Sequence, residues 1–102
     1  MTDKLFDELW AERKRQADRL VAMLDKIPNL LPTFAPQQRE AYDALEERRQ
    51  RWRKTLREGQ QELLNQTDEK EYMLRQLALL ERDAEMLRDF ANAYAAIIRN
   101  DF

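Results

Sequence analysis

Apolar residues recur along the first quarter of the chain at the three- and four-residue intervals of an amphipathic helix. Seven positions form a continuous stripe with one arginine among them: Phe6, Trp10, Arg13, Ala17, Leu20, Leu24 and Ile27. This heptad spacing keeps the side chains on one side of a helix. We expect a helix over about 2–27, with Thr2 as its N-cap. Pro28 should end it, because the residue before a proline is pushed out of the helical conformation.

A second helix is expected over about 36–65. Pro36 suits a first helical turn, where the missing backbone N–H would have no partner in any case. The stripe of this segment is weaker, because it includes an arginine and a glycine: Tyr42, Leu45, Arg49, Trp52, Leu56, Gly59 and Leu63. Between the two helices lies a loop, 28–36, that holds all three prolines of the chain.

The segment over about 68–99 has the strongest helical pattern. Its heptad stripe has no charged member: Met73, Leu77, Leu80, Ala84, Leu87, Ala91, Tyr94 and Ile98. A flanking stripe widens the apolar face: Leu79, Met86, Phe90, Ala93 and Ile97. A helix with so wide a face packs against two neighbours. The sequence therefore predicts an all-α fold, an antiparallel three-helix bundle with coiled-coil-like packing, as one domain over 1–102.

The junction at 63–72 leaves an alternative open. It has no Gly or Pro, and the heptads run through it in phase, so one helix could continue from about 36 to 99. Such a long helical hairpin would dimerise as a coiled coil. We favour a turn, with Asn65 as a left-handed C-cap and with Asp68 and Glu71 as a capping box.

Folding the helices back on one another sets a register for the charges. Pairing the first two helices places Trp10 level with Trp52, and the basic segment 13–15 level with the basic segment 48–54. Residue 52 falls level with about residue 81, close to four acids: Glu81, Asp83, Glu85 and Asp89. We therefore expect the basic band to pair with acids of the third helix. Arg13 and Arg49 should lay their stems over Trp10 and Trp52 while their charged heads pair with acids.

Composition narrows the classes of partner. The 102 residues are 37% charged, but 18 basic residues against 20 acidic ones leave a net charge of only −2. This balance disfavours DNA or an anionic membrane as a general electrostatic partner. The longest apolar-rich stretch, 90–98, is too short to cross a bilayer. The first residues lack a basic start followed by an apolar segment, so we expect no secretory signal and a cytoplasmic protein.

Three residue types that carry much of enzyme chemistry are absent, namely His, Cys and Ser. Their absence removes the common general base, the thiol and serine nucleophiles and the usual zinc ligands. The single glycine also leaves no phosphate-binding loop. We therefore expect no catalytic residues, no metal site and no cofactor, and we interpret the chain as a protein without enzymatic activity.

A cluster of basic residues surrounds Trp52, at positions 48–57. Arginines interleaved with an aromatic residue can bind phosphates and stack on bases, which makes Arg49, Arg53 and Arg57 candidate anion-binding residues. The alternative is a solvated helix face paired with neighbouring acids. Because the domain as a whole has a pI near 5.3, we favour that alternative over nucleic-acid binding.

The sequence leaves one apolar surface for a partner. In the proline-rich loop, Leu30, Leu31 and Phe34 either plug one end of the bundle or form an uncharged edge for binding. The alanine-rich end of the third helix offers Phe90, Tyr94, Ile97 and Ile98. We expect a protein–protein interaction module, such as a small chaperone, adaptor or inhibitor, that uses these residues for helix-in-groove recognition of another protein. The alternatives are a structural coiled-coil homodimer and a nucleic-acid-binding regulator.

Overall fold

The computed structural model describes the backbone of residues 2–102 and the side chains of residues 4–102. It contains three long helices, α1 (Thr2–Leu30), α2 (Pro36–Leu64) and α3 (Glu69–Arg99), and a short 3₁₀ helix, η1 (Leu31–Thr33). No strand occurs among the described residues. The predicted all-α three-helix bundle is confirmed. The N-cap role predicted for Thr2 depends on a side chain outside the described part.

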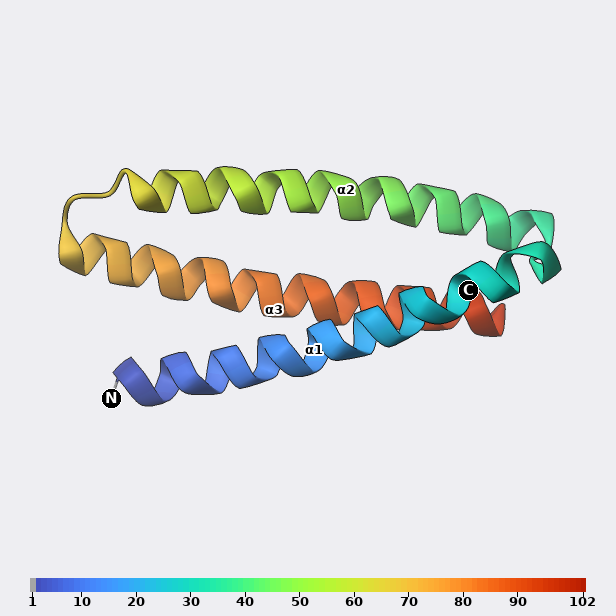
Figure 1. Ribbon diagram of the computed structural model, residues 1–102, viewed down its shortest axis with the longest axis horizontal. Helices are drawn as coiled ribbons and strands as arrows, with labels where there is room; N and C mark the ends of the chain where they lie inside the picture. Colours follow the sequence, from blue (N-terminus) through green and yellow to red (C-terminus); the bar gives the residue numbers. More distant parts are fainter. Residues whose placement is uncertain (1) are drawn as a thin grey trace.

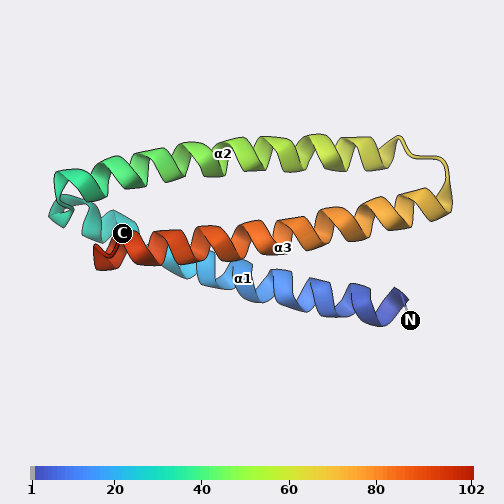
Figure 2. The same ribbon diagram turned by 180° about the vertical axis from the view of Figure 1, so that it is seen from behind.

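The three helices lie side by side in an elongated molecule of 51 × 25 × 20 Å (Figure 1). α2 and α3 form an antiparallel hairpin, and α1 lies along α3 and runs in the same direction; the view from behind shows the same arrangement (Figure 2). Both α1 and α2 pack on α3, whereas they make few contacts with each other. The predicted pairing of the first two stripes is therefore wrong, because the wide apolar face of α3 takes up both.

The apolar core lies at one end of the molecule, where the second half of α1 meets the first half of α2 and the last turns of α3. Its buried members come from all three helices: Leu20, Ile27, Leu45, Trp52, Phe90, Ala91, Tyr94 and Ile97. Each large apolar side chain removed from water contributes about 1.5–3 kcal/mol. We call the end of the molecule that contains this core the closed end.

The first connection is shorter than predicted. α1 continues through Pro28 to Leu30, so the expectation that the proline ends the helix is wrong. Because Pro28 lies in the last turn, its missing N–H removes only one late backbone bond. The Thr33 hydroxyl then donates to the Leu30 carbonyl at 2.6 Å. Leu31 and Phe34 pack against the core, which agrees with a plug.

Gln38 holds this connection to the end of α3. Its side-chain carbonyl accepts from the backbone N–H of Ala35 at 2.8 Å, and its amide donates to the carbonyl of Ile97 at 2.9 Å. The side chain is buried. It therefore supplies a partner both to the start of α2 and to the C-terminal turn of α3, where backbone groups lack helical partners.

The predicted turn between α2 and α3 is confirmed at residues 65–68. Asp68 caps α3 by accepting from the backbone N–H of Glu71 at 2.9 Å. The capping box is only half formed, because the Glu71 carboxylate accepts from Arg75 instead. Asn65 has φ −91° and ψ −5°, so the left-handed conformation predicted for it is wrong. The left-handed cap is Asn100, at the end of α3.

Candidate functional site

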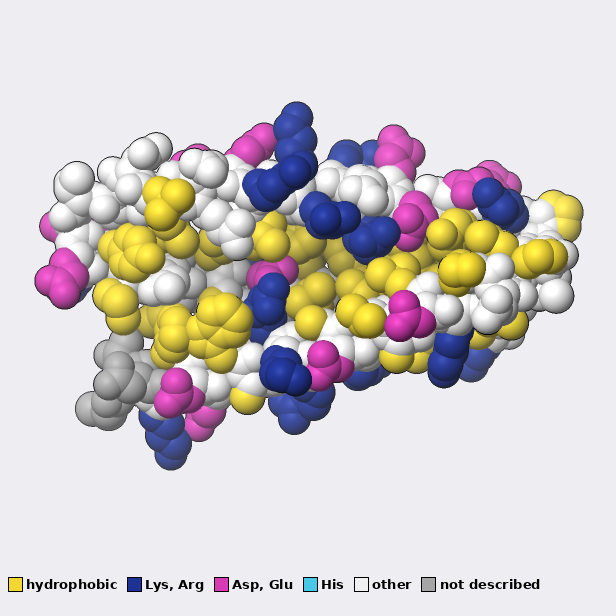
Figure 3. Space-filling model, in the orientation of Figure 1, with side chains coloured by type: hydrophobic (Ala, Val, Ile, Leu, Met, Phe, Trp, Pro, Cys, Tyr) yellow, Lys and Arg dark blue, Asp and Glu magenta, His cyan; other side chains and the backbone are white. Residues whose placement is uncertain are grey.

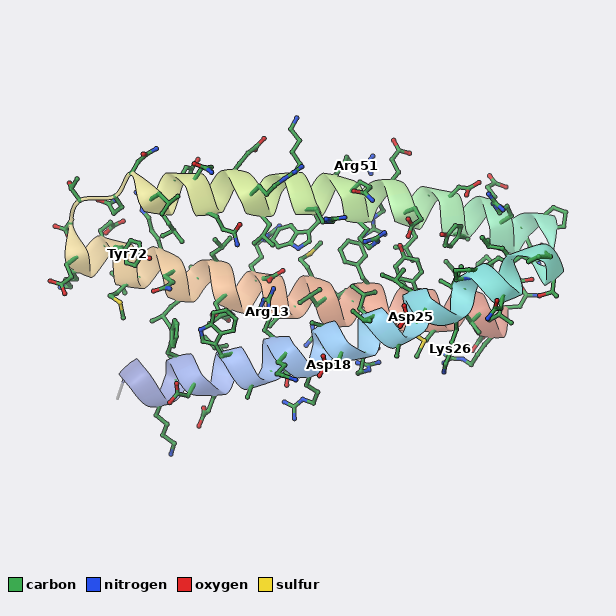
Figure 4. The ribbon with its side chains drawn as sticks, in the orientation of Figure 1. Arg13, Asp18, Asp25, Lys26, Arg51 and Tyr72 are labelled. Atoms are coloured by element: carbon green, nitrogen blue, oxygen red, sulfur yellow. The ribbon has the colours of Figure 1, made fainter. Side chains whose placement is uncertain are left out.

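A buried carboxylate joins the three helices midway along the molecule. Asp83 of α3 is 4% exposed. Its Oδ2 accepts from Arg13 Nε of α1 at 2.6 Å, and its Oδ1 accepts from Trp52 Nε1 of α2 at 3.2 Å. The side chain of Arg13 extends from α1 toward α3 in Figure 4. One acid thus takes a donor from each neighbouring helix, which satisfies a charge that would otherwise be costly to bury.

The position of Asp83 tests the predicted charge register. Residue 52 does lie level with the acids near residue 81, as predicted, and the Arg13 guanidinium does stack over Trp10, at 5.4 Å from the ring centroid. The predicted pairing of the basic band with acids of α3 is confirmed for Arg13, which pairs with Asp83, and is wrong for the basic segment of α2. Apart from Arg13–Asp83, the ion pairs in the described part of the chain all lie within single helices. Pairs three or four residues apart form within a helix without any tertiary contact.

A second polar cluster lies inside the closed end. The Tyr94 hydroxyl, on a fully buried residue, donates to Glu46 Oε1 at 2.5 Å and accepts from Arg49 Nε at 3.2 Å. Arg49 also donates to Glu46 Oε2 at 3.0 Å. Burial and the hydrogen bond to Glu46 raise the pKa of Tyr94 well above its usual value. Burial alone would raise the pKa of Glu46, but hydrogen bonds from Arg49 and Tyr94 and the Arg49 charge outweigh it and hold that pKa below 4.5.

The apolar residues predicted to bind a partner lie mainly in the core. Phe90, Tyr94 and Ile97 are 2%, 0% and 4% exposed, so they offer no surface to another protein. Leu30, Leu31, Phe34 and Ile98 are half-buried at the closed end. Phe90, Tyr94 and Ile97 are therefore not available to a partner, because side chains of both α1 and α2 pack on this end of α3.

The candidate anion-binding residues separate into two kinds. The Arg49 side chain is 18% exposed and is engaged by Glu46 and Tyr94, so it does not face solvent as an anion site would require. Arg53 and Arg57 are exposed and make no ion pair within residues 4–102. Trp52 is stacked by Arg82 rather than by Arg49, with the guanidinium 5.5 Å from the ring centroid. The three arginines therefore do not form one site.

An open groove lies at the other end of the molecule, between the first half of α1 and the second half of α2. Its volume is about 300 Å³, and the Arg13–Asp83 pair forms part of its wall. The other lining residues are apolar or amide side chains of the three helices: Trp10, Leu56, Gln60, Leu63, Leu64, Tyr72, Gln76, Leu79 and Leu80. Figure 3 shows this apolar trough between the rims formed by α2 and α1. We call it the open-end groove.

Two residues of the open-end groove project large apolar surface into solvent. Trp10 is 44% exposed and Leu64 is 75% exposed, whereas Trp52 is 7% exposed in the core. Both tryptophans belong to the apolar stripes of their helices, yet only Trp52 is buried. The sequence contained one indication that Trp10 would be less buried: the next member of its stripe is a charged residue, Arg13.

The described residues contain no group of three acids, histidines or cysteines placed to hold a metal ion. Within the same part of the chain, no helix is long and apolar enough to cross a membrane. Comparison with known protein families, with curated proteins and with solved structures finds no match for the chain. The open-end groove, with Trp10 and Leu64 exposed at its edges, is therefore the candidate functional site.

Proposed function

We propose that this chain is a non-enzymatic protein–protein interaction module, of the kind that chaperones, adaptors and inhibitors use. It takes up an apolar segment of a partner protein in the open-end groove. The observation that carries the proposal is that Trp10 and Leu64 stand exposed on opposite rims of an apolar groove. Grooves between helices are common sites for amphipathic partner segments.

The chemistry of the groove supports binding over catalysis. Its titratable members are Arg13, Asp83 and Tyr72, and the first two are already paired with each other. A nucleophile activated by an adjacent base is not among the lining residues. Trp10, in contrast, is of the residue type most enriched where binding energy concentrates in interfaces. Truncation of such an anchor costs about 2 kcal/mol or more of binding free energy.

The nucleic-acid alternative has less support. Arg49 is engaged within the closed end and Arg51 pairs with Glu47, which leaves Arg53 and Arg57 as the solvent-facing members of the proposed set. In Figure 4, Arg51 lies on the side of α2 away from α1. The basic side chains of α2 thus point in several directions, whereas backbone recognition needs them on one face.

The test is capture of cellular proteins by the immobilised full chain, quantified by mass spectrometry, with variants of the groove. Trp10→Ala and Leu64→Ala should each reduce capture of groove partners about tenfold or more. Leu74→Ala is the matched control, because Leu74 is 55% exposed and does not line the groove. It should capture as the wild type does. Equal capture by all four proteins would contradict the proposal.

A further inference from the structure

The two rims of the open-end groove differ in charge. On α2, Arg53 and Arg57 each precede by seven residues a side chain that lines the groove, Gln60 and Leu64 respectively. Seven residues are two helical turns, so Arg53 and Arg57 continue the same rim along α2. In Figure 3, the Lys and Arg side chains on the α2 side gather over the middle of the molecule, next to the part of the trough nearer the closed end. Neither arginine makes an ion pair within residues 4–102, so both charges are available to a partner.

The rim on α1 has no such excess of charge. Trp10 and Val21 are both more than 40% exposed and lie on one stripe of α1, eleven residues apart. On the same stripe, Lys14 lies between them and pairs with Asp18 on the same helix at 3.1 Å. The groove therefore has an apolar rim on α1 and a rim on α2 that two basic residues continue, and the charged residues between them, Arg13 and Asp83, are paired with each other.

Shape decides between a helix and a second copy as the occupant. The groove is concave and is bounded by two helices with a third beneath, so one further helix would complete a four-helix arrangement at ordinary helix spacing. A second copy would bring another concave groove to the interface. Two facing grooves leave a void, and loss of packing contacts makes such a void unfavourable.

We propose that the occupant is an amphipathic helix of a partner protein whose apolar stripe is flanked by Asp or Glu on the side that meets Arg53 and Arg57. This inference rests on the function proposed above and names the chemistry of the partner. The apolar stripe packs on Trp10, Leu64 and the α3 side chains between them. The acidic flank selects the partner, since opposite charges at an interface contribute mainly to specificity and association rate.

Two synthetic peptides of about three heptads test the proposal. They share one leucine stripe and differ only at the flanking positions, which are Glu in one peptide and Lys in the other. Binding to the full chain is measured by fluorescence anisotropy at about 0.1 M salt, where charges roughly 10 Å apart still interact. The variant R53E/R57E reverses the rim. R48E/K54E is the matched control: it has the same change in net charge, at exposed α2 residues that do not lie seven residues before a groove-lining side chain.

We expect the Glu peptide to bind the wild type and R48E/K54E about tenfold more tightly than the Lys peptide, and R53E/R57E to reverse this preference. Equal binding of both peptides, an equal effect of R48E/K54E, or failure of both peptides to bind would overturn the inference. A dimer in light scattering that R53E/R57E dissociates would make a second copy the occupant and would also overturn it. These results leave the proposed function standing as long as Trp10→Ala still reduces protein capture about tenfold or more. If that reduction is absent too, the proposed function fails separately.

Discussion

Arg13 Nε and Asp83 Oδ2 lie 2.6 Å apart and form the ion pair that links α1 to α3. Counting side-chain atoms alone, Asp83 is 6% exposed and Arg13 is 33% exposed. The pair is set where the apolar core gives way to the open-end groove. Because Asp83 also accepts from Trp52, this single acid fixes the level of all three helices relative to one another.

Removal of one member of this pair should destabilise the fold more than removal of both. Arg13→Met leaves the Asp83 carboxylate buried with only the indole donor, and we expect a loss of about 2 kcal/mol in the free energy of unfolding. R13M/D83N should recover part of that loss, because an uncharged amide of nearly the same size replaces the carboxylate and can still accept from Trp52. Urea unfolding followed by circular dichroism measures both values. A double variant less stable than Arg13→Met alone would show that the pair stabilises the fold beyond satisfying a buried charge.

The buried amide of Gln38 gives a second prediction. Gln38→Ala leaves the Ile97 carbonyl without its side-chain donor and the Ala35 N–H without its acceptor, and it should cost about 1–2 kcal/mol. The neighbouring Gln37→Ala is the matched control, because Gln37 is exposed and its truncation should change stability by less than about 0.5 kcal/mol. Thermal unfolding of the two variants compares them directly. Similar melting temperatures would mean that water replaces both partners of Gln38 at little cost.

The single glycine lies inside α2, where α2 approaches α3 closely. A Cβ added at Gly59 would lie 3.2 Å from Leu79 Cδ1, so the leucine must shift by a few tenths of an ångström. Leu79 is half-buried and lines the open-end groove, which gives it room to move. Gly59→Ala should therefore stabilise the fold by about 0.5 kcal/mol through the better helix propensity of alanine. Destabilisation in a urea titration would show instead that Leu79 is held in place.

The Glu46 cluster predicts an acid-dependent loss of stability. The pKa of Glu46 is held below 4.5 in the folded protein, so the folded state favours the ionised form. Its contribution is present above the pKa of the unfolded chain and is lost as the pH falls through the folded value. The stability difference between the wild type and Glu46→Gln should therefore shrink as the pH falls below about 4.5. Urea unfolding midpoints of both proteins from pH 3 to pH 7 test this. A stability difference that does not change with pH would show that ionisation of Glu46 does not contribute to the acid-dependent loss of stability.

The positions of the three helices and of the turn between α2 and α3 could be predicted from the sequence. Heptad stripes placed the three helices, and the turn with Asp68 as cap was expected in spite of the continuous heptads, because capping is a local interaction between residues three apart. The end of α1 was predicted wrongly at Pro28, and the reason is again local. The rule that a proline ends a helix does not distinguish a proline in the last turn, where only one backbone bond is lost, from one in the middle.

The pairing of helices was not readable in this way. Each stripe specifies an apolar face but not which neighbouring helix covers it. The first two stripes were therefore predicted to pair with each other, whereas both pack on α3. The same uncertainty misplaced the binding surface. Tyr94 and Ile97 look available on an alanine-rich helix end, yet both are buried in the core, where Tyr94 bonds to Glu46 and Arg49 of α2.

The sequence by itself thus determined the helical segments, the Asp68 cap of α3, the absence of His, Cys and Ser, and the wide face of α3. Only the tertiary structure decided that α1 lies along α3, that Asp83 receives a donor from each of the other helices, and that Trp10 and Leu64 border an open groove. The physical reason is that helix formation and capping depend on neighbours within a few residues. Burial depends on which of several compatible apolar faces meet, and that choice is made by the packing of the whole chain.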